Sequence, residues 1–290
     1  MRVLVRAPDH LGDGVMALPA IEGLQPLGAL TIAGPPWIHE LYRHIPATFV
    51  APDQVPSTPA ALAVLLKPSL SAAWAARRIP RRVGLDTDHR RALLHVAVRE
   101  LGPHRMHDLS AVARAAGGQP EGLPCFPTGP SDTTGLPPLP ARAVLLLPGT
   151  ASPETVRWPG FRALADLLGG RAVFAGGPAD QALISEIAGP HPRVTATAIG
   201  ALAALAVAAQ AVVGNDSGLA HLAAAARRAA GLAPSDVHVV YGSTQAERTG
   251  PPGSTPHMGA RPDCWPCYRK RCEIGTPCLI HPADAVAAAL

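Results

Sequence analysis

The sequence predicts an α/β protein of two successive domains, each built on a mostly parallel sheet, that face each other across a cleft. Three observations lead to this prediction. The chain has 290 residues, whereas one ordinary domain holds about 100 to 200. Short apolar runs alternate with segments of helical character, which is typical of parallel strands joined by helical crossovers. A Pro-rich segment interrupts the alternation once, and the pattern restarts beyond it.

The first half opens with a β-branched run over residues 2–6, which is followed by a polar loop and a helical segment over 12–24. Residues 29–35 repeat the pattern of a strand that ends at a Gly-Pro break. The other elements that the pattern predicts in this half are a strand at 61–66 and helices at 69–79, 89–100 and 108–116.

The domain boundary is predicted in the Pro-rich segment 119–140, because Pro breaks regular structure. We expect an N-terminal Rossmann-like domain over 1–125, a linker over 126–141 and a C-terminal Rossmann-like domain over 142–290, which ends in a Cys-rich tail over 262–281. The C-terminal pattern predicts strands at 143–149, 171–177, 211–215 and 237–243 and helices near 160–168, 179–188, 200–209, 217–230 and 282–290.

Composition excludes several classes of protein. Hydrophobic residues make up 48% of the chain and charged residues 16%, which indicates a compact protein and not a disordered one. No apolar run is long enough to span a membrane, and the N-terminus does not resemble a signal peptide, so we expect a cytoplasmic protein. A net charge of +4 with only 4% aromatic residues argues against nucleic-acid binding.

Asp13 stands out in the loop after the first strand. It lies at a predicted helix start, where free backbone N–H groups and the helix dipole stabilise a carboxylate. Proteins with this architecture expose catalytic groups at such positions, since ligands bind at the carboxyl ends of the strands. The residue alone is equally consistent with a simple helix cap.

A second polar cluster follows the strand at 211–215. Asp216 or Ser217 can cap the next helix, and Gly218 permits tight backbone geometry there. The free N–H groups of that helix start suit a phosphate or a ribose hydroxyl, and His221 lies one turn further on the same side. An ordinary cap with a half-buried histidine remains the alternative.

The third polar loop follows the strand at 143–149. It carries Thr150, Ser152 and Arg157 before Trp158-Pro159, and Pro is a normal residue at a first helical position. A positive charge near a helix N-terminus is unfavourable unless an anion binds there, so Arg157 indicates an anion site.

Several motifs in the same order resemble the ADP-heptose:lipopolysaccharide heptosyltransferases, particularly their type II branch. The resemblance covers nearly the whole chain and rests on LVRAPDHLGDGVMALPAI, PRRVGL, LPGT with RWP, VVGNDSGLAH, VVYGSTQAERTGP, CWPCYRKRC and CLIHPADAV. These enzymes are inverting glycosyltransferases of the GT-B fold. The resemblance therefore implies that the N-terminal domain binds the acceptor and the C-terminal domain binds an ADP-sugar.

The resemblance also assigns roles to the polar residues. Asp13 takes the position of the general base that removes the proton of the acceptor hydroxyl. The leaving ADP is stabilised without a metal by helix N-termini and side chains. The residues that match the donor-binding motifs are Thr150, Ser152, Arg157, Asp216, Ser217, Gly218 and His221.

Two features depart from the family pattern. The family usually has a Lys directly before Arg-Trp-Pro, and here that residue is Val156, which leaves phosphate neutralisation to Arg157. Little chain separates Val50 from the strand at 61–66, so the acceptor domain is expected to be trimmed by one helix.

The acceptor domain is rich in Arg pairs. His10, Arg81 and Arg82 are the candidate acceptor ligands, and an anionic glycolipid such as a phosphorylated sugar core suits them. Such an acceptor implies a peripheral position at the cytoplasmic face of a membrane. A solvated basic surface is the alternative.

The tail contains four cysteines in the pattern C-x2-C-x4-C-x5-C. Thiolates of Cys264, Cys267, Cys272 and Cys278 suit a structural Zn or Fe ion in tetrahedral geometry. Related heptosyltransferases that modify proteins carry a four-Cys iron finger, whereas no cofactor is expected for catalysis.

The predicted activity is the transfer of a heptose or related sugar from an ADP-sugar to an acceptor hydroxyl of a lipopolysaccharide-core-like glycan. One alternative keeps the transfer but uses a small-molecule acceptor, such as a secondary metabolite. The others are a nucleotide-sugar epimerase of similar architecture and a noncatalytic nucleotide-sugar-binding protein.

Overall fold

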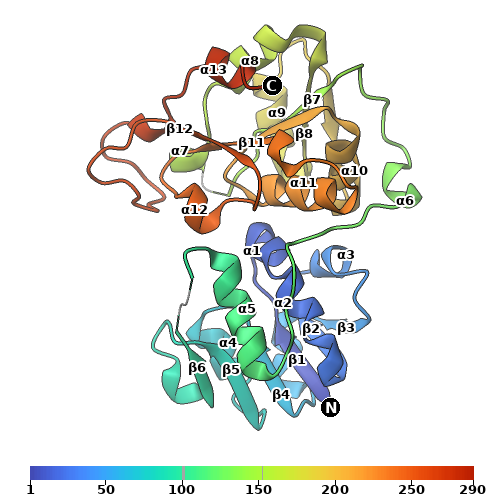
Figure 1. Ribbon diagram of the computed structural model, residues 1–290, viewed down its shortest axis with the longest axis vertical. Helices are drawn as coiled ribbons and strands as arrows, with labels where there is room; N and C mark the ends of the chain where they lie inside the picture. The colour runs from blue at the N-terminus through green and yellow to red at the C-terminus, as the bar shows by residue number, and fades with distance from the viewer. Residues whose placement is uncertain (100–101, 152) are drawn as a thin grey trace. The chain divides into compact units, whose positions relative to one another are not determined.

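The computed structural model describes residues 1–99, 102–151 and 153–290, and the chain divides into two compact units. The first unit is Met1–Pro124 and the second is Cys125–Leu290. Each unit contains a six-stranded sheet in which every strand pair is parallel (Figure 1). The predicted α/β class with two doubly wound units is therefore confirmed.

The first unit arranges its strands in the order β3-β2-β1-β4-β5-β6. Strands β1 and β4 lie at its centre, and their apolar residues, 3–5 and 62–65, are buried on both faces, as parallel sheets covered by helices require. Its elements are β1 Arg2–Arg6, α1 Leu11–Met16, α2 Leu18–Glu22, η1 Gln25–Leu27, β2 Ala29–Ala33, α3 Ile38–Leu41, β3 Ala47–Val50, η2 Pro52–Ser57, β4 Leu62–Leu65, α4 Leu70–Ala75, β5 Arg81–Leu85, η3 Arg91–Leu93, β6 Val96–Val98 and α5 Arg105–Ala116.

The second unit repeats this topology in the order β12-β11-β10-β7-β8-β9. Its elements are α6 Pro130–Thr133, β7 Val144–Leu147, α7 Pro153–Val156, α8 Phe161–Leu168, η4 Gly169–Arg171, β8 Ala172–Gly176, η5 Pro178–Asp180, α9 Gln181–Ile187, β9 Arg193–Thr195, α10 Ile199–Ala208, β10 Ala211–Asn215, α11 Gly218–Ala229, η6 Pro234–Asp236, β11 Val237–Tyr241, α12 Ala246–Thr249, β12 Thr255–Met258, η7 Pro277–Leu279 and α13 Ala283–Ala287.

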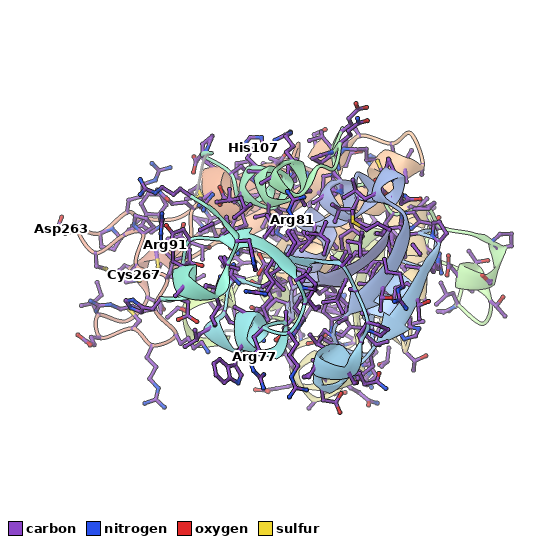
Figure 2. The ribbon with its side chains drawn as sticks, turned by 90° about the horizontal axis from the view of Figure 1, so that it is seen from below. Arg77, Arg81, Arg91, His107, Asp263 and Cys267 are labelled. Carbon is purple, nitrogen blue, oxygen red and sulfur yellow. The ribbon has the colours of Figure 1, made fainter. Side chains whose placement is uncertain are left out.

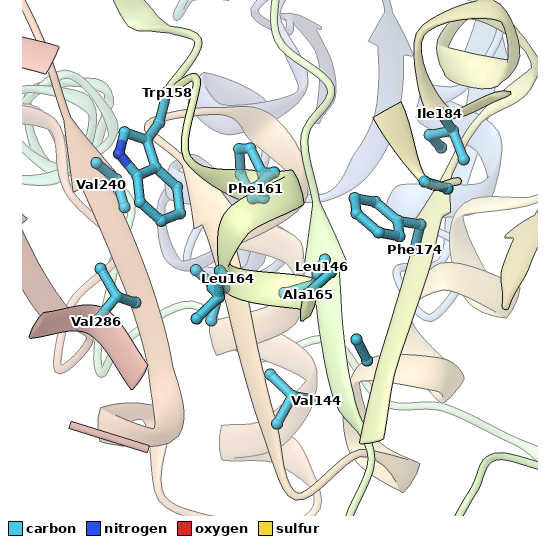
Figure 3. Close-up of a cluster of buried hydrophobic side chains, with 13 residues drawn as sticks. Val144, Leu146, Trp158, Phe161, Leu164, Ala165, Phe174, Ile184, Val240 and Val286 are labelled. Carbon is cyan, nitrogen blue, oxygen red and sulfur yellow. The ribbon is translucent and has the colours of Figure 1, made fainter. Parts of the chain in front are cut away.

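A large apolar cluster joins helices α8 and α13 to the second sheet (Figure 3). Trp158 and Phe161 pack edge to face at a centroid distance of 5.2 Å, and both are almost fully buried. The same cluster contains the strand residues Val144, Phe174 and Val240, and Val286 adds the last helix to it. The segment that carries Arg157 and Trp158 is therefore anchored to the core.

The edge of the first sheet differs from the prediction. Residues 89–100 were expected to form a helix, but their described part forms the 3-10 turn η3 and the strand β6. Val96 pairs with Val83 of β5, because a β-branched run beside an open sheet edge gains backbone hydrogen bonds there. The short strands β3, β5, β9 and β12 were also not predicted.

The Pro-rich segment 126–141 packs on the second unit. Phe126 is fully buried, and its N–H donates to the carbonyl of Ala225 in α11 at 3.1 Å. The short helix α6 within this segment contacts α10. Residues 126–141, which we expected to form a separate linker, are thus part of the second unit.

Both sheets reverse their winding direction at one place, which is between β1 and β4 in the first unit and between β7 and β10 in the second. In open α/β sheets the crevice for ligands lies at the carboxyl ends of the strands at this switch point. The loops after these four strands are therefore the first places to look for a site. Among the described residues, no helix is both long and apolar enough to cross a membrane.

Candidate functional site

A charged cluster occupies the switch point of the first unit. Asp9 follows β1 and Lys67 follows β4, and the two side chains form an ion pair. Arg6 holds the other carboxylate oxygen of Asp9, with 2.6 Å between Nη2 and Oδ1. Burial raises the pKa of Asp9, but hydrogen bonds and charges from Lys67 and Arg6 outweigh it, so the pKa lies below the usual range. Asp9 is therefore a fixed anion that joins the two loops.

Asp13, the candidate base, is the third residue of α1 and is about one-third exposed. Its Oδ1 lies 3.7 Å from Nε of Arg105 at the start of α5. Arg105 also lies 3.8 Å from the fully buried carboxylate of Asp108. One arginine thus neutralises two carboxylates, and only that of Asp13 reaches solvent.

Tyr42 fixes the helix that carries Asp13. Its hydroxyl donates to the carbonyl of Gly14 at 2.9 Å, and its ring is fully buried. Burial raises the pKa of Tyr42 far above its ordinary value, and the charge of Asp13 raises it further. The phenol therefore remains a proton donor and keeps α1 in place.

The structure separates the three predicted acceptor ligands. His10 is exposed and precedes α1, on the same loop as Asp13. Arg81 and Arg82 begin β5 and pair in register with Leu62 and Ala63 of β4, so they lie at the amino end of the sheet, away from that loop. Arg82 donates to the carbonyls of Arg77, Ile79 and Leu93, which makes it a support of the α4–β5 turn.

Arg90 is a buried residue that the sequence did not single out. It donates to the carbonyls of Leu85 and Lys67 at 2.9 and 2.7 Å, and thereby connects the loops after β5 and β4. Burial is the main reason that its pKa falls to about 10, still far above neutrality. Arg90 therefore holds Lys67 beside Asp9 while remaining charged.

Asn215 organises the switch point of the second unit. This last residue of β10 is fully buried and accepts from the N–H of Trp158 at 2.8 Å. Its Nδ2 donates to the carbonyl of Pro148 at 2.8 Å. A single amide side chain therefore fixes both ends of the segment 148–158, which contains Thr150 and Arg157.

Ser217 precedes the twelve-residue helix α11, but its hydroxyl does not cap the helix. Within the ranges that the structure describes, the Oγ atom is buried and has no hydrogen-bond partner, and the same is true of Nε of Arg157. Unsatisfied buried polar atoms are costly, and native proteins keep few of them. These two atoms lie on the two loops where an anionic ligand was predicted.

The other predicted donor ligands occupy the same loops. Asp216 and Gly218 flank Ser217, and His221 is buried one turn into α11. Thr249 Oγ1 donates to Asp216 Oδ2 at 3.4 Å, which connects the loop after β11 to this group. Thr150 follows β7, and Ser152 lies outside the described residues. Val156, in place of the family lysine, is buried.

The helix expected to begin at Pro159 begins two residues later. Helix α8 starts at Phe161, and Pro159 lies in the preceding turn. The bulk of Trp158 explains the shift, because its indole packs so closely against Gly160 that a Cβ there would collide with it. Arg157 therefore stands in an irregular segment between α7 and α8.

The Cys-rich tail is joined to the loops after β7 and β11 by hydrogen bonds to backbone carbonyls. Cys267 and Tyr268 donate their N–H groups to the carbonyl of Ser243 at 3.1 Å, and Trp265 Nε1 donates to Gly242 at 3.0 Å. Thr155 Oγ1 donates to the carbonyl of Arg269 at 2.6 Å. The tail thus supports the loops after β7 and β11.

No disulfide joins the four tail cysteines in the described chain. Burial raises the pKa of the Cys278 thiol, and the proximity of the other three cysteines adds to the effect. In the described part of the chain, no group of three or more His, Cys, Asp or Glu side chains is arranged to hold a metal ion. The described side chains, as the structure places them, are not arranged around a Zn or Fe ion. Metal binding by Cys264, Cys267, Cys272 and Cys278 stays a prediction.

Two doubly wound units form the architecture of the GT-B fold, and solved glycosyltransferase structures share it. The E. coli ADP-heptose lipopolysaccharide heptosyltransferase II matches over 100% of this chain and 97% of its own, with 21% identity and a TM-score of 0.77. E. coli heptosyltransferase WaaC, solved with ADP, matches over 99% and 98%, with 16% identity and a TM-score of 0.73. A glycosyl transferase family 9 protein of Veillonella parvula matches over 88% and 84%, with 20% identity and a TM-score of 0.67.

The family follows from the sequence itself. The model of glycosyltransferase family 9 (heptosyltransferase) matches residues 58–276, and the chain belongs to this family. A search of the curated proteins finds no match. The resemblance that the motifs indicated is therefore confirmed at the level of the family.

Proposed function

We propose that this glycosyltransferase moves a heptose or related sugar from an ADP-sugar to an acceptor hydroxyl, with inversion and without a catalytic metal. The observation that carries the proposal is the pair of buried polar atoms, Ser217 Oγ and Arg157 Nε, that lack a partner among the described residues. They lie on the two loops of a switch point, one of them at the start of a long helix. A diphosphate supplies the acceptors that both atoms need.

Asp13 is the proposed general base. Its carboxylate takes the proton of the acceptor hydroxyl while that oxygen forms a bond to the anomeric carbon of the donor. The bond from that carbon to the β-phosphate oxygen breaks, and its electron pair leaves with ADP. A single displacement of this kind inverts the anomeric carbon. The guanidinium of Arg105 lies 3.7 Å from the carboxylate of Asp13, so a positive charge stands beside the proposed base.

Arg157 and the N-terminus of α11 would receive the charge that develops on the leaving diphosphate. Asn215 holds both loops in advance through hydrogen bonds of 2.8 Å, so little reorganisation accompanies the reaction. The support for ADP as the nucleotide comes from the family and from the similar fold of WaaC, which was solved with ADP. Thr150, Asp216, Gly218 and His221 complete the proposed donor site.

The proposed acceptor is an anionic glycolipid of the lipopolysaccharide-core type. The cations of Lys67 and Arg105 stand at the same sheet edge as Asp13 and suit phosphate or carboxylate groups. One observation favours the small-molecule alternative: residues 51–61 contain only the 3-10 helix η2 where the family has a helix. Turnover of a soluble acceptor in place of a core glycolipid would distinguish the two.

Calorimetric titration of the protein with ADP, UDP, GDP and CDP tests the donor half of the proposal. We expect ADP to bind at least about tenfold more tightly than the others, and Asp216→Ala to weaken ADP binding by a similar factor. Glu186→Ala, which removes an exposed acid from α9 of the same unit, is the matched control and should leave the affinity unchanged. A preference for another nucleotide would overturn the ADP assignment, and binding of none would overturn the transferase proposal.

A further inference from the structure

Helix α4 of the first unit exposes large apolar side chains to solvent. Trp74 is 58% exposed and Leu70 is 45% exposed, and both are among the most exposed large apolar residues of the described chain. They are four residues apart and so lie on one face of the helix. The opposite face, with Ala72 and Ala73, is buried against the sheet. The exposed face therefore contributes nothing to the core.

Arginine side chains surround the end of this face. The guanidinium of Arg77 stacks on Trp74 with 4.5 Å between Cζ and the ring centroid, and its Nη1 donates to the Trp74 carbonyl at 3.0 Å. Arg78 and Arg81 follow and are exposed. Residues 70–81 contain no Asp or Glu. Figure 2 shows Arg77 at the periphery of the molecule. We call Leu70, Trp74, Arg77 and Arg78 the α4 patch.

Two carboxylates lie near the other end of α4. Asp88 accepts the N–H of Leu70 at 2.5 Å and so stabilises the helix start. Asp53 belongs to η2, which packs against α4. The positive charge is thus concentrated at the C-terminal end of α4, beside the exposed indole.

We propose that the α4 patch binds the surface of an anionic lipid membrane. Trp74 and Leu70 would enter the boundary between headgroups and acyl chains, where indole rings are favoured. Arg77 and Arg78 would pair with lipid phosphates, which their planar guanidinium groups match. The charge of the patch selects an anionic surface over a neutral one.

A second protein copy fits the α4 patch less well. A stable protein interface buries about 800 Å² on each partner around a large apolar centre. The patch offers two apolar side chains with arginines beside them, and two such patches would repel each other. A membrane requires no such area, because each inserted side chain and each cation contributes separately.

The inference rests on the proposed function in one respect: the proposed glycolipid acceptor lies in a membrane, and the α4 patch is the surface that would bind this membrane. Binding of the patch to vesicles is tested without measuring activity. An enzyme with a lipid-linked acceptor must reach the membrane that carries the acceptor. The α4 patch would supply this attachment from the acceptor unit itself. Attachment of the protein and transfer of the sugar can therefore be measured separately.

The test measures co-sedimentation of the full-length protein with vesicles of phosphatidylcholine, alone or with about one-third phosphatidylglycerol, in about 0.1 M NaCl. We expect binding to the anionic vesicles at least about tenfold stronger than to the neutral ones, and weaker at higher salt. The triple variant Trp74→Ser, Arg77→Gln, Arg78→Gln should lose at least about tenfold of this binding. The matched control is Leu167→Ser with Arg193→Gln, which changes an exposed leucine and an exposed arginine of the second unit.

ADP titration and the thermal midpoint of each variant check that it is folded. Equal binding to neutral and anionic vesicles, or unchanged binding of the triple variant, would overturn the proposal. Concentration-dependent dimers that the triple variant abolishes, without vesicle binding, would assign the patch to a second copy instead. If the parent binds none of the nucleotides, the thermal midpoint alone checks folding, and loss of vesicle binding in a folded triple variant would then support the α4 patch while the proposed function is rejected.

Discussion

The two units share one strand order and yet prepare their switch points in opposite ways. In the first unit the carboxylates beside the switch point are already paired: Asp9 lies between Arg6 and Lys67, and Asp13 faces Arg105, although Thr87 Oγ1 and Arg90 Nη2 are buried without a partner among the described residues. In the second unit the neutral Asn215 holds the loops, while Ser217 Oγ and Arg157 Nε are buried without a partner in the described ranges. The topology therefore determines where a ligand can meet each sheet, and the side chains determine what happens there.

This difference separates two tasks. In the first unit, the paired charges of Lys67 and Arg6 hold the pKa of Asp9 below its usual range. Unpaired donors leave the second unit with hydrogen bonds that only a ligand can complete. The proposed function accordingly assigns proton transfer to the first unit and anion binding to the second.

The largest effect is expected for Asp13→Asn. The amide keeps the shape of the carboxylate but cannot accept the proton, so kcat should fall about 10²- to 10⁴-fold. The affinity for ADP should not change, because Asp13 belongs to the first unit. Initial rates of ADP release from ADP-heptose with a heptose-free core glycan measure kcat, and calorimetry measures the affinity. Asp53→Asn, an exposed acid of the same unit, is the control. A kcat within a few-fold of the parent would remove Asp13 from the mechanism.

The next largest effect concerns Asn215→Ala. The truncation leaves the Trp158 N–H and the Pro148 carbonyl without their partner, which should lower the free energy of unfolding by about 2 to 4 kcal/mol. ADP binding should weaken as well, since both ends of segment 148–158 are released. Urea unfolding followed by circular dichroism measures the loss. Gln210→Ala, an exposed amide at the start of the same strand, should cost less than about 1 kcal/mol. Equal costs for the two variants would contradict the role of Asn215.

Much of the fold could be predicted because the central strands carry a strong signal. The inner residues of β1, β4, β7 and β10 are buried on both faces and form continuous apolar runs. The edge strands β3, β6 and β9 are short and partly exposed, so nothing in their pattern distinguishes them from loops. The helix predicted at 89–100 failed for this reason.

The candidate site was predictable where it follows a central strand directly. Asp13, Asp216 and Ser217 were predicted in this way and stay predictions, and the position of Lys67 just after β4 was an available signal that was missed. Arg90 and Arg105 could not have been found, because they reach Lys67 and Asp13 from distant parts of the chain. Only the tertiary structure shows these contacts.

A buried histidine group of the second unit predicts how stability depends on pH. His238 Nδ1 lies 2.9 Å from His257 Nε2, and the ring of His281 lies 5.3 Å from that of His257. Burial, together with the charges of His238 and His281, lowers the pKa of His257 to about 4. Burial also lowers the pKa of His238, although the nearby Asp236 opposes this.

The unfolded chain therefore binds more protons than the native one between about pH 6.5 and 4. The contribution of these neutral histidines to the free energy of unfolding should be fully present above about pH 6.5, and it should be lost as the pH falls to about 4. Since one pKa unit is worth about 1.4 kcal/mol, the loss should approach about 3 kcal/mol. Urea unfolding of the parent and of His257→Gln across this range measures it. His44→Gln, which removes a histidine paired with Glu22 at the surface, should keep the parent slope. A slope that survives in His257→Gln would assign the effect to other groups.

The smallest effects are expected for two serines that precede equivalent helices of the two units, α4 and α11. Ser69 precedes α4, and its Oγ accepts the N–H of Ala72 at 3.2 Å, whereas the Ser217 hydroxyl before α11 makes no such bond. Ser69→Ala should lower the free energy of unfolding by about 1 kcal/mol and leave ADP affinity unchanged. Ser217→Ala should leave stability within about 0.5 kcal/mol and weaken ADP binding about five- to tenfold. Urea unfolding and calorimetry on both variants give the four values. A loss of stability in Ser217→Ala with unchanged ADP binding would mean that this hydroxyl serves the fold and that the second unit does not reserve it for a ligand.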